Sequence, residues 1–503
     1  MQIYLYLIIA YLLVLLGFNF YRSRKVKNQE DFMVAGRSLS LKVMVFTLIC
    51  TWIGSGTFIG GAEFAAKAGF SSLWMPAGAW VGIIIIYFLA GKIRTFGQYT
   101  IGDILEVRYG KFARIFGAIA LIISFTAIVS YQFKAGGFIL DIITDHAINT
   151  QMGTIYTAIF VIIFTASAGM LAVAYTDLPN GIIIVLACII SLPFTYFASG
   201  GMANAVKVLP HSHFTLFGGF GSHPTLKVGA YFLSTMLLLL GIQSMYQKFY
   251  SAKSPKEAKQ SVILWVIGTI IVESVVVFIA VFASVKFWPQ ISEFISSGGK
   301  SGVDPAAIVL LAARKLVPTW VGVFLLAAAC AVVLSTGMNY LLSPTTNMIR
   351  DIYQKFINKD ASQKSVVLLQ KILIVILGIF ALYAALNLES VLETAYFAYT
   401  IYGVAITPAL IAALAWKRAT KLAGNLSIIL GTVAVVFLKL IGYIYPHIMV
   451  PFNNPNGDPW GIPIIYPSII ISLGTLILVS YLTPPPSKEV LKTFFPDLKE
   501  SEK

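Results

Sequence analysis

Long apolar runs recur along the whole chain and constrain its fold more than any other feature. A helix that spans a bilayer needs about 20 mostly apolar residues. Runs of this kind begin near residues 3, 41, 72, 112, 153, 178, 228, 261, 316, 367, 391, 425 and 463. Only 11% of the residues are charged, and no polar stretch is long enough to form a separate globule. The sequence therefore predicts one all-α integral-membrane domain over residues 1–503, with about 13 transmembrane helices.

The Lys and Arg residues are divided unevenly between alternate loops. One set of loops and the C-terminal tail carry 27 of the 36, whereas the other set carries six. The positive-inside rule places the richer set in the cytoplasm, so an odd number of spans predicts an outer N-terminus and a cytoplasmic tail at 483–503 of a cell-membrane protein. Basic loops beside an anionic leaflet also account for the net charge of +15, so no nucleic-acid partner is implied.

The second apolar run contains an unusual concentration of small residues. Gly54-Ser55-Gly56 lies at its centre, and Gly60-Gly61 follows. Glycine weakens a helix, and an unwound backbone at this depth is tolerated only where it is buried in protein or lines a polar cavity. We interpret the run as a helix broken at a binding site, because Thr51 and Thr57 add hydroxyl groups there. The alternative is that small residues permit close helix packing.

A second interruption is predicted in the seventh run, where Gly241-Ile242-Gln243-Ser244 follows a strongly apolar stretch. The two broken runs would then open two repeats of five spans, over residues 41–199 and 228–416. Because five is odd, successive repeats would insert with opposite orientation. One extra helix at 3–20 and two at 425–482 would flank them.

The ninth run places two adjacent hydroxyls, Ser335 and Thr336, in an otherwise apolar helix. With the carbonyl of Val332 one turn earlier, they offer three neutral oxygens. The unwound second run would free further carbonyls, such as those of Cys50 and Ile53. Five neutral oxygens suit sodium. The alternative is that both hydroxyls bond back to the preceding turn of their own helix.

Four motifs carry a resemblance to a known family. They are Thr51-Trp52-Ile53-Gly54-Ser55-Gly56-Thr57-Phe58, Ala174-Tyr175-Thr176-Asp177, Tyr246-Gln247-Lys248-Phe249, and the stretch from Leu334-Ser335-Thr336 to Asp351-Ile352-Tyr353. On these motifs the chain resembles the sodium:solute symporters over nearly its whole length. The resemblance implies a five-plus-five inverted repeat like that of the bacterial leucine transporter, with three extra helices.

The resemblance also implies a sodium site between the second and ninth spans. Residue by residue, its ligands fall on the carbonyls of Cys50, Ile53 and Val332 and on the hydroxyls of Ser335 and Thr336. This is the set already reached from oxygen chemistry. Sodium is the one cofactor that the sequence implies.

Some members of the family bind a further cation with hydroxyls one turn beyond this pair and with the aspartate at Asp177. Here the hydroxyl positions are Met338 and Asn339, and a thioether is a poor sodium ligand, so the sequence argues against a second site. Asp177 has another interpretation, because it precedes Leu178 and Pro179 and would cap a helix that begins there. We favour capping or gating.

Lys134 lies deep in the fourth apolar run, where an unpaired cation costs several kcal/mol. It would contact a carboxylate of the solute, pair with a buried acid such as Glu273, or extend its ammonium group to the outer surface. We therefore treat Lys134, like Asp177, as a candidate gating or charge-balancing residue. Trp52 falls where choline-transporting members of the family have a pocket tryptophan, and an aromatic face binds a quaternary ammonium.

Together these features predict a sodium-coupled symporter that imports a small polar solute by alternating access. The predicted solute pocket contains Trp52, Thr57, Tyr131 and Gln243. A proton-driven symporter and a nontransporting nutrient sensor of the same fold remain alternatives. An enzyme is not predicted, because no nucleotide-binding loop or catalytic set occurs in the sequence.

Overall fold

Apolar helices make up nearly all of the chain. The computed structural model describes residues 2–24, 26–96, 99–220, 223–388, 390–445, 449–450 and 462–495. Within them, twelve helical segments are long and apolar enough to cross a membrane, and a shorter apolar helix covers Leu41–Trp52. Each of the thirteen predicted runs corresponds to one of these segments. The strands in the described part are β1 (Met449–Val450) and β2 (Ile462–Pro463), which pair in parallel.

The long helices and their continuations are α1 (Gln2–Ser23), α3 (Leu41–Trp52), α4 (Ala62–Ala68), α5 (Trp74–Phe96), α7 (Lys111–Ile143), α8 (Thr150–Ala198), α10 (Pro224–Gly241), α11 (Gln243–Ser251), α12 (Pro255–Ser296), α14 (Thr319–Asn347), α15 (Gln363–Leu386), α16 (Val391–Ala405), α17 (Thr407–Ala415), α18 (Lys421–Ile444) and α19 (Ile465–Leu482). Short helices are α2 (Gln29–Val34), α6 (Ile101–Tyr109), α9 (Gly201–Val208), α13 (Ile308–Lys315) and α20 (Lys488–Phe494). Single turns and irregular helices are η1 (Ala35–Arg37), η2 (Gly56–Gly61), η3 (Gly69–Leu73), η4 (His211–Phe214), η5 (Gly218–Phe220), η6 (Pro305–Ala307) and η7 (Met348–Ile357).

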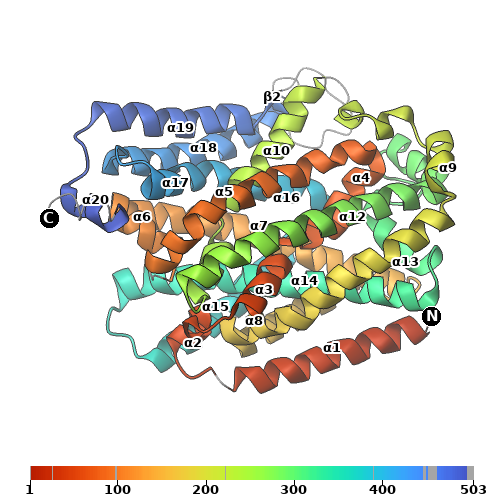
Figure 1. Ribbon diagram of the computed structural model, residues 1–503, viewed down its shortest axis with the longest axis horizontal. Coiled ribbons are helices and arrows are strands. Elements are labelled where there is room, and N and C mark those ends of the chain that lie inside the picture. Colours follow the sequence, from red (N-terminus) through yellow and green to blue (C-terminus); the bar gives the residue numbers. More distant parts are fainter. Residues whose placement is uncertain are drawn as a thin grey trace.

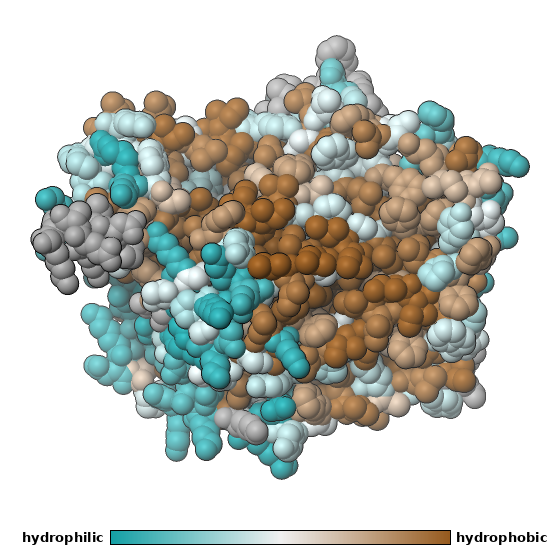
Figure 2. All heavy atoms as spheres, in the orientation of Figure 1, coloured by the Kyte–Doolittle hydropathy of each residue, from teal (hydrophilic) through white to brown (hydrophobic). Residues whose placement is uncertain are grey.

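The long helices run side by side along one axis of the molecule (Figure 1). Helix α1 lies along one edge of the bundle, and α18 and α19 lie along the opposite edge. The chain starts at one end of the bundle, and α20 lies at the other end, as an odd number of crossings requires. Apolar side chains dominate the middle of the face shown in Figure 2, and polar ones gather mainly toward its left-hand part. Such a surface is suited to a lipid environment.

Two helix breaks occur where the sequence predicts them. Helix α3 ends at Trp52, and Ile53 leaves the helical region with φ −74° and ψ 96°. Helix α10 ends at Gly241, and Ile242 is extended before α11 begins. The hydroxyl of Tyr402 accepts a hydrogen bond from the Gln243 N–H and donates one to the Gly241 carbonyl, each at 2.9 Å. This single side chain therefore satisfies backbone groups freed by the second break.

A third break, between α16 and α17, is absent from the sequence interpretation. It lies at Ile406, directly before Thr407-Pro408. Proline lacks the N–H that would continue the hydrogen-bond ladder, so this dipeptide was the available signal.

The boundary between the fifth and sixth spans lies earlier than predicted. Helix α8 covers both spans and is interrupted at Gly169, where φ is +67°. That left-handed conformation is readily adopted only by glycine. Asp177 therefore lies inside the second half of α8, and the prediction that it caps a helix beginning at Leu178 is wrong.

The start of the C-terminal tail packs against the helical bundle. Phe494 of α20 is fully buried, and its ring stacks on Phe96 of α5 at a centroid distance of 5.3 Å. Residues 496–503 lie outside the described part.

Candidate functional site: a cation site beside a small cavity

The break after α3 meets the hydroxyl pair of α14. The Thr336 hydroxyl donates to the carbonyls of Cys50 (3.0 Å) and Ile53 (3.2 Å), and the Ser335 hydroxyl lies 3.4 Å from the Cys50 carbonyl. The last carbonyls of a helix have no partner within it, so a broken helix presents them to its neighbours. Four of the five predicted sodium ligands therefore lie together, in a region fully shielded from solvent.

The fifth predicted ligand is the carbonyl of Val332. Val332 is buried one turn before Thr336 on α14, so its carbonyl points along the helix toward the amide of Thr336. Neither hydroxyl of the pair bonds back to its own helix, because both reach across to other segments. The alternative of simple back-bonding is therefore wrong for Ser335 and Thr336.

Gly54 lies close against Thr336 of α14. A Cβ at this position would lie 2.8 Å from Thr336 Cγ2 and 2.9 Å from Gln132 Nε2. The Gln132 side chain in turn accepts a hydrogen bond from the Ser55 N–H at 3.1 Å. A side chain larger than hydrogen at residue 54 would separate the two halves of the candidate cation site.

We expect Gly54→Ala to weaken sodium binding about tenfold or more, because relieving an overlap of this kind costs about 1–3 kcal/mol and displaces Thr336. Sodium-dependent thermal stabilisation of the purified protein measures the effect. Gly60→Ala is the matched control, since the nearest atom to its new methyl group would be 3.6 Å away. Equal sodium affinity in the two variants would contradict this account of Gly54.

Asp177 lies directly behind the hydroxyl pair. Its carboxylate accepts hydrogen bonds from Ser335, from Thr47 and from Asn339, the last at 3.2 Å. The buried ammonium of Lys248 lies 3.8 Å from the same carboxylate and donates to Oδ1 of the Asn339 side-chain amide. Several hydrogen bonds and one opposite charge thus compensate the burial of this carboxylate.

Lys248 was missed as a site residue. In the sequence it was noted only within the Tyr246-Gln247-Lys248-Phe249 motif, but it lies inside α11 and is fully buried. Its ammonium already balances the charge of Asp177.

A small cavity adjoins the broken helix and is lined in part by Trp52, Gly56 and Thr57. Glu273 of α12 lines it, and the Glu273 carboxylate accepts hydrogen bonds from the indole N–H groups of Trp52 (3.0 Å) and Trp80 (2.7 Å) and from the Thr57 hydroxyl (3.4 Å). The cavity has about 30 Å³ of space. Its lining residues are Trp52, Gly56, Thr57, Gly61, Ser72, Met75, Pro76, Thr235, Glu273, Val276, Val277 and Tyr399. A volume of this size holds one or two water molecules.

The four predicted pocket residues do not all lie together. Trp52 and Thr57 line the cavity, and the hydroxyl of Tyr131 lies 3.4 Å from that of the lining residue Tyr399. Gln243 lies elsewhere, because its side-chain oxygen accepts a hydrogen bond from the Ile101 N–H at 2.7 Å. The first amides of a helix have no partner within it, so Gln243 satisfies one at the start of α6.

Lys134 is half-buried on α7 and makes no ion pair with Glu273. Its charge acts instead on Asp304, in the segment between α12 and α13. Burial raises the pKa of Asp304, while the ammonium groups of Lys67 and Lys134 oppose that rise. Of the partners considered for Lys134 in the sequence, Glu273 is therefore not the one that the structure provides.

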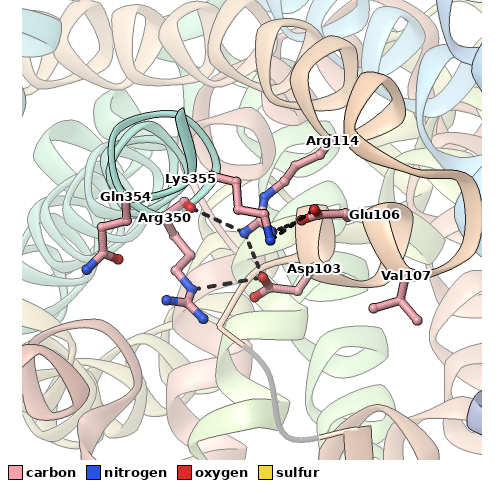
Figure 3. A pocket seen from close by; sticks show the side chains of 7 residues that line it. All are labelled: Asp103, Glu106, Val107, Arg114, Arg350, Gln354 and Lys355. Carbon is pink, nitrogen blue, oxygen red and sulfur yellow. Dashed lines mark hydrogen bonds and ion pairs between the residues drawn. The ribbon is translucent and has the colours of Figure 1, made fainter. Parts of the chain in front are cut away.

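A second cavity, of about 440 Å³, lies among charged residues of α6, α7 and η7 (Figure 3). Arg114 forms ion pairs with Asp103 (2.6 Å), Asp351 (2.7 Å) and Glu106. Lys355 contacts Glu106 at 2.9 Å, and Arg350 approaches Asp103 at 3.9 Å. We call these six residues the charged network. It joins segments more than 230 residues apart in the sequence.

Comparison with known proteins decides the family. The family model of the sodium:solute symporters matches residues 32–431, which is most of the chain. The chain belongs to the sodium:solute symporter family. It is therefore a membrane transporter rather than an enzyme, and the resemblance noted in the sequence is confirmed.

Named relatives and a solved structure agree with this family. The high-affinity proline transporter of Bacillus subtilis (strain 168) is 26% identical, over 96% of this chain and 98% of its own length. The high-affinity choline transporter 1 of Homo sapiens is also 26% identical, over 95% of this chain and 84% of its own. A Na⁺-coupled sialic acid symporter, solved in a substrate-bound outward-open state, matches with a TM-score of 0.77 and 16% identity, over 97% of this chain and 99% of the other. The predicted fold, an inverted five-plus-five repeat with extra helices, is confirmed.

Proposed function

We propose that this transporter uses the inward movement of sodium across the cell membrane to import a small polar solute. The observation that carries the proposal is the contact of Ser335 and Thr336 with the carbonyls of Cys50 and Ile53. These atoms are neutral oxygens at a helix break, and neutral oxygens suit a monovalent hard cation. With the carbonyl of Val332 they form the proposed ligand set.

Sodium would act by fastening the broken helix to α14. The Thr336 hydroxyl bonds directly to the carbonyls of Cys50 and Ile53. A bound ion would instead accept lone pairs from the hydroxyl and carbonyl oxygens, and would hold the break in one geometry. Coupling requires that the ion bind one conformation more tightly than the other. We propose that the favoured conformation is the outward-open one, which accepts the solute.

The solute would bind in the cavity beside the break, which Trp52 and Thr57 line and to which Tyr131 lies adjacent. The present cavity of about 30 Å³ is too small for a solute, so binding requires it to widen. Trp52 and Thr57 flank the break that carries the sodium ligands. One movement of the break would thus alter both sites, which is the physical basis proposed for coupling.

The proposed repeats cover residues 41–199 and 228–416. In support, a broken helix lies near the start of each, in α3 and in α10 with α11. We further propose that the N-terminus is outside and the C-terminus cytoplasmic, on the distribution of Lys and Arg. The charged network would then lie on the cytoplasmic side with α6. Gating by Asp177 and charge balance by Lys134 are parts of the same proposal.

Uptake into proteoliposomes tests the proposed function. Labelled amino acids, amines, sugars and organic acids are presented to the reconstituted protein with an inward sodium gradient, an inward proton gradient or neither. We expect accumulation of at least one solute above its external concentration only under the sodium gradient. Accumulation driven by protons alone would support the proton-coupled alternative, and a protein that binds solute without transporting it would support a sensor.

A further inference from the structure

Glu273 differs from every other buried acid in the described part of the chain. Of those acids, Glu63 pairs with Lys67, Asp177 with Lys248, and both Asp103 and Asp351 with Arg114. Glu273 is only 4% exposed, yet no basic group lies within ion-pair distance of it among the described residues.

The groups around Glu273 are suited to a carboxylate that receives an additional partner. Two indole N–H groups and one hydroxyl donate to its oxygens. These neutral donors orient the group but leave its charge uncompensated, and a buried charge without an opposite charge is costly. Glu273 also lines the cavity, where it is the single charged residue. A positive group that enters the cavity would supply the missing charge.

Aromatic rings complete the site. Trp52 and Tyr399 line the cavity with Glu273, and Trp80 contacts the carboxylate from α5. The faces of indole and phenol rings attract cations. A small ion binds its water strongly and so gives it up reluctantly for a ring face, whereas an organic ammonium group holds its water less strongly. A carboxylate flanked by such rings is selective for an organic ammonium group over a neutral group of the same shape.

We propose that the imported solute is an organic cation whose ammonium group binds against Glu273 between these rings. This proposal rests on the proposed function and narrows its substrate class. The same electrostatics disfavours a zwitterion, because its carboxylate would share the cavity with Glu273 and no basic residue lines that cavity.

Three probes of nearly equal shape test the proposal. Choline carries a positive charge, its neutral carbon analogue has carbon in place of nitrogen, and glycine betaine adds a carboxylate. Their binding to the purified full-length protein in lipid nanodiscs, in sodium, is measured by calorimetry. We expect choline to bind at least about tenfold more tightly than the other two. Glu273→Gln should reduce this preference to about one, while Glu273→Asp should keep it.

Glu293→Gln is the matched control, because it makes the same change at an exposed position of α12. It should leave the preference for choline unchanged. Equal or tighter binding of the neutral analogue or of betaine, a preference that survives Glu273→Gln, or no binding of choline would each overturn the proposal. Thermal stabilisation by sodium is measured in every variant. Its absence in the wild-type protein would count against the proposed sodium coupling, whatever the three probes show.

Discussion

The double substitution Ser335→Ala/Thr336→Ala is expected to abolish sodium-driven accumulation of solute. It removes two of the five proposed oxygen ligands, including the hydroxyl that contacts both Cys50 and Ile53. Loss of groups that only orient metal ligands already costs about 10–100-fold in affinity, so loss of two ligands should cost at least about 100-fold. Uptake into proteoliposomes at graded sodium concentrations measures the change, and the sodium dependence should disappear.

A control must separate this effect from the loss of any buried hydroxyl. Thr165→Ala serves this purpose, because the Thr165 hydroxyl is buried on α8 but bonds back to its own helix, to Val161 at 2.7 Å. This variant should retain the sodium dependence of the wild-type protein. If the Ser335/Thr336 variant accumulates solute as well as the Thr165 variant does, the cation site is not between α3 and α14.

Replacing Arg114 by methionine is expected to lower the free energy of unfolding by about 3–5 kcal/mol. Arg114 is the common partner of three carboxylates, and its loss leaves Asp351 buried without an opposite charge. Removing one member of a buried ion pair is more costly than never having the pair, because the remaining charge stays desolvated. Equilibrium unfolding in detergent, followed by circular dichroism, measures the change.

Two further variants sharpen this result. Arg314→Met removes an arginine that pairs with Asp145, a residue whose side chain is 47% exposed, and should cost less than about 1 kcal/mol. The double variant Arg114→Met/Asp351→Asn should be more stable than Arg114→Met alone. The amide at residue 351 carries no charge, so no buried charge is left there without a partner. Equal losses for Arg114→Met and Arg314→Met would show that the charged network does not stabilise the fold.

The sequence predicted the transmembrane architecture because hydrophobicity is a local property. Each apolar run is long enough to span a bilayer by itself, so the helices could be found without knowing how they pack. The break at Gly54 was also visible, since glycine and hydroxyl residues occur together there. The break at Ile406 and the kink at Gly169 were missed, because a single proline or glycine has many roles in a membrane helix.

The sequence also indicated which oxygens lie together at the proposed cation site, for a related reason. Adjacent hydroxyls in an apolar helix and a glycine-rich break are both uncommon in a sequence. The hydroxyls offer side-chain oxygens and the break offers backbone carbonyls, and neither depends on how the helices pack. The sequence could not show that Gln243 lies at the start of α6 rather than beside Trp52, because this depends on how α11 packs against a helix that begins about 140 residues earlier.

What the sequence by itself determined was therefore the number of spans, two of the helix breaks and the oxygen-bearing residues that we propose as cation ligands. Tertiary structure alone decided which buried charges have partners. Lys248 meets Asp177, and Arg114 meets Asp351, whereas no basic group reaches Glu273. The physical reason is that electrostatic compensation depends on distances of a few ångströms between groups on different helices, and only packing sets those distances.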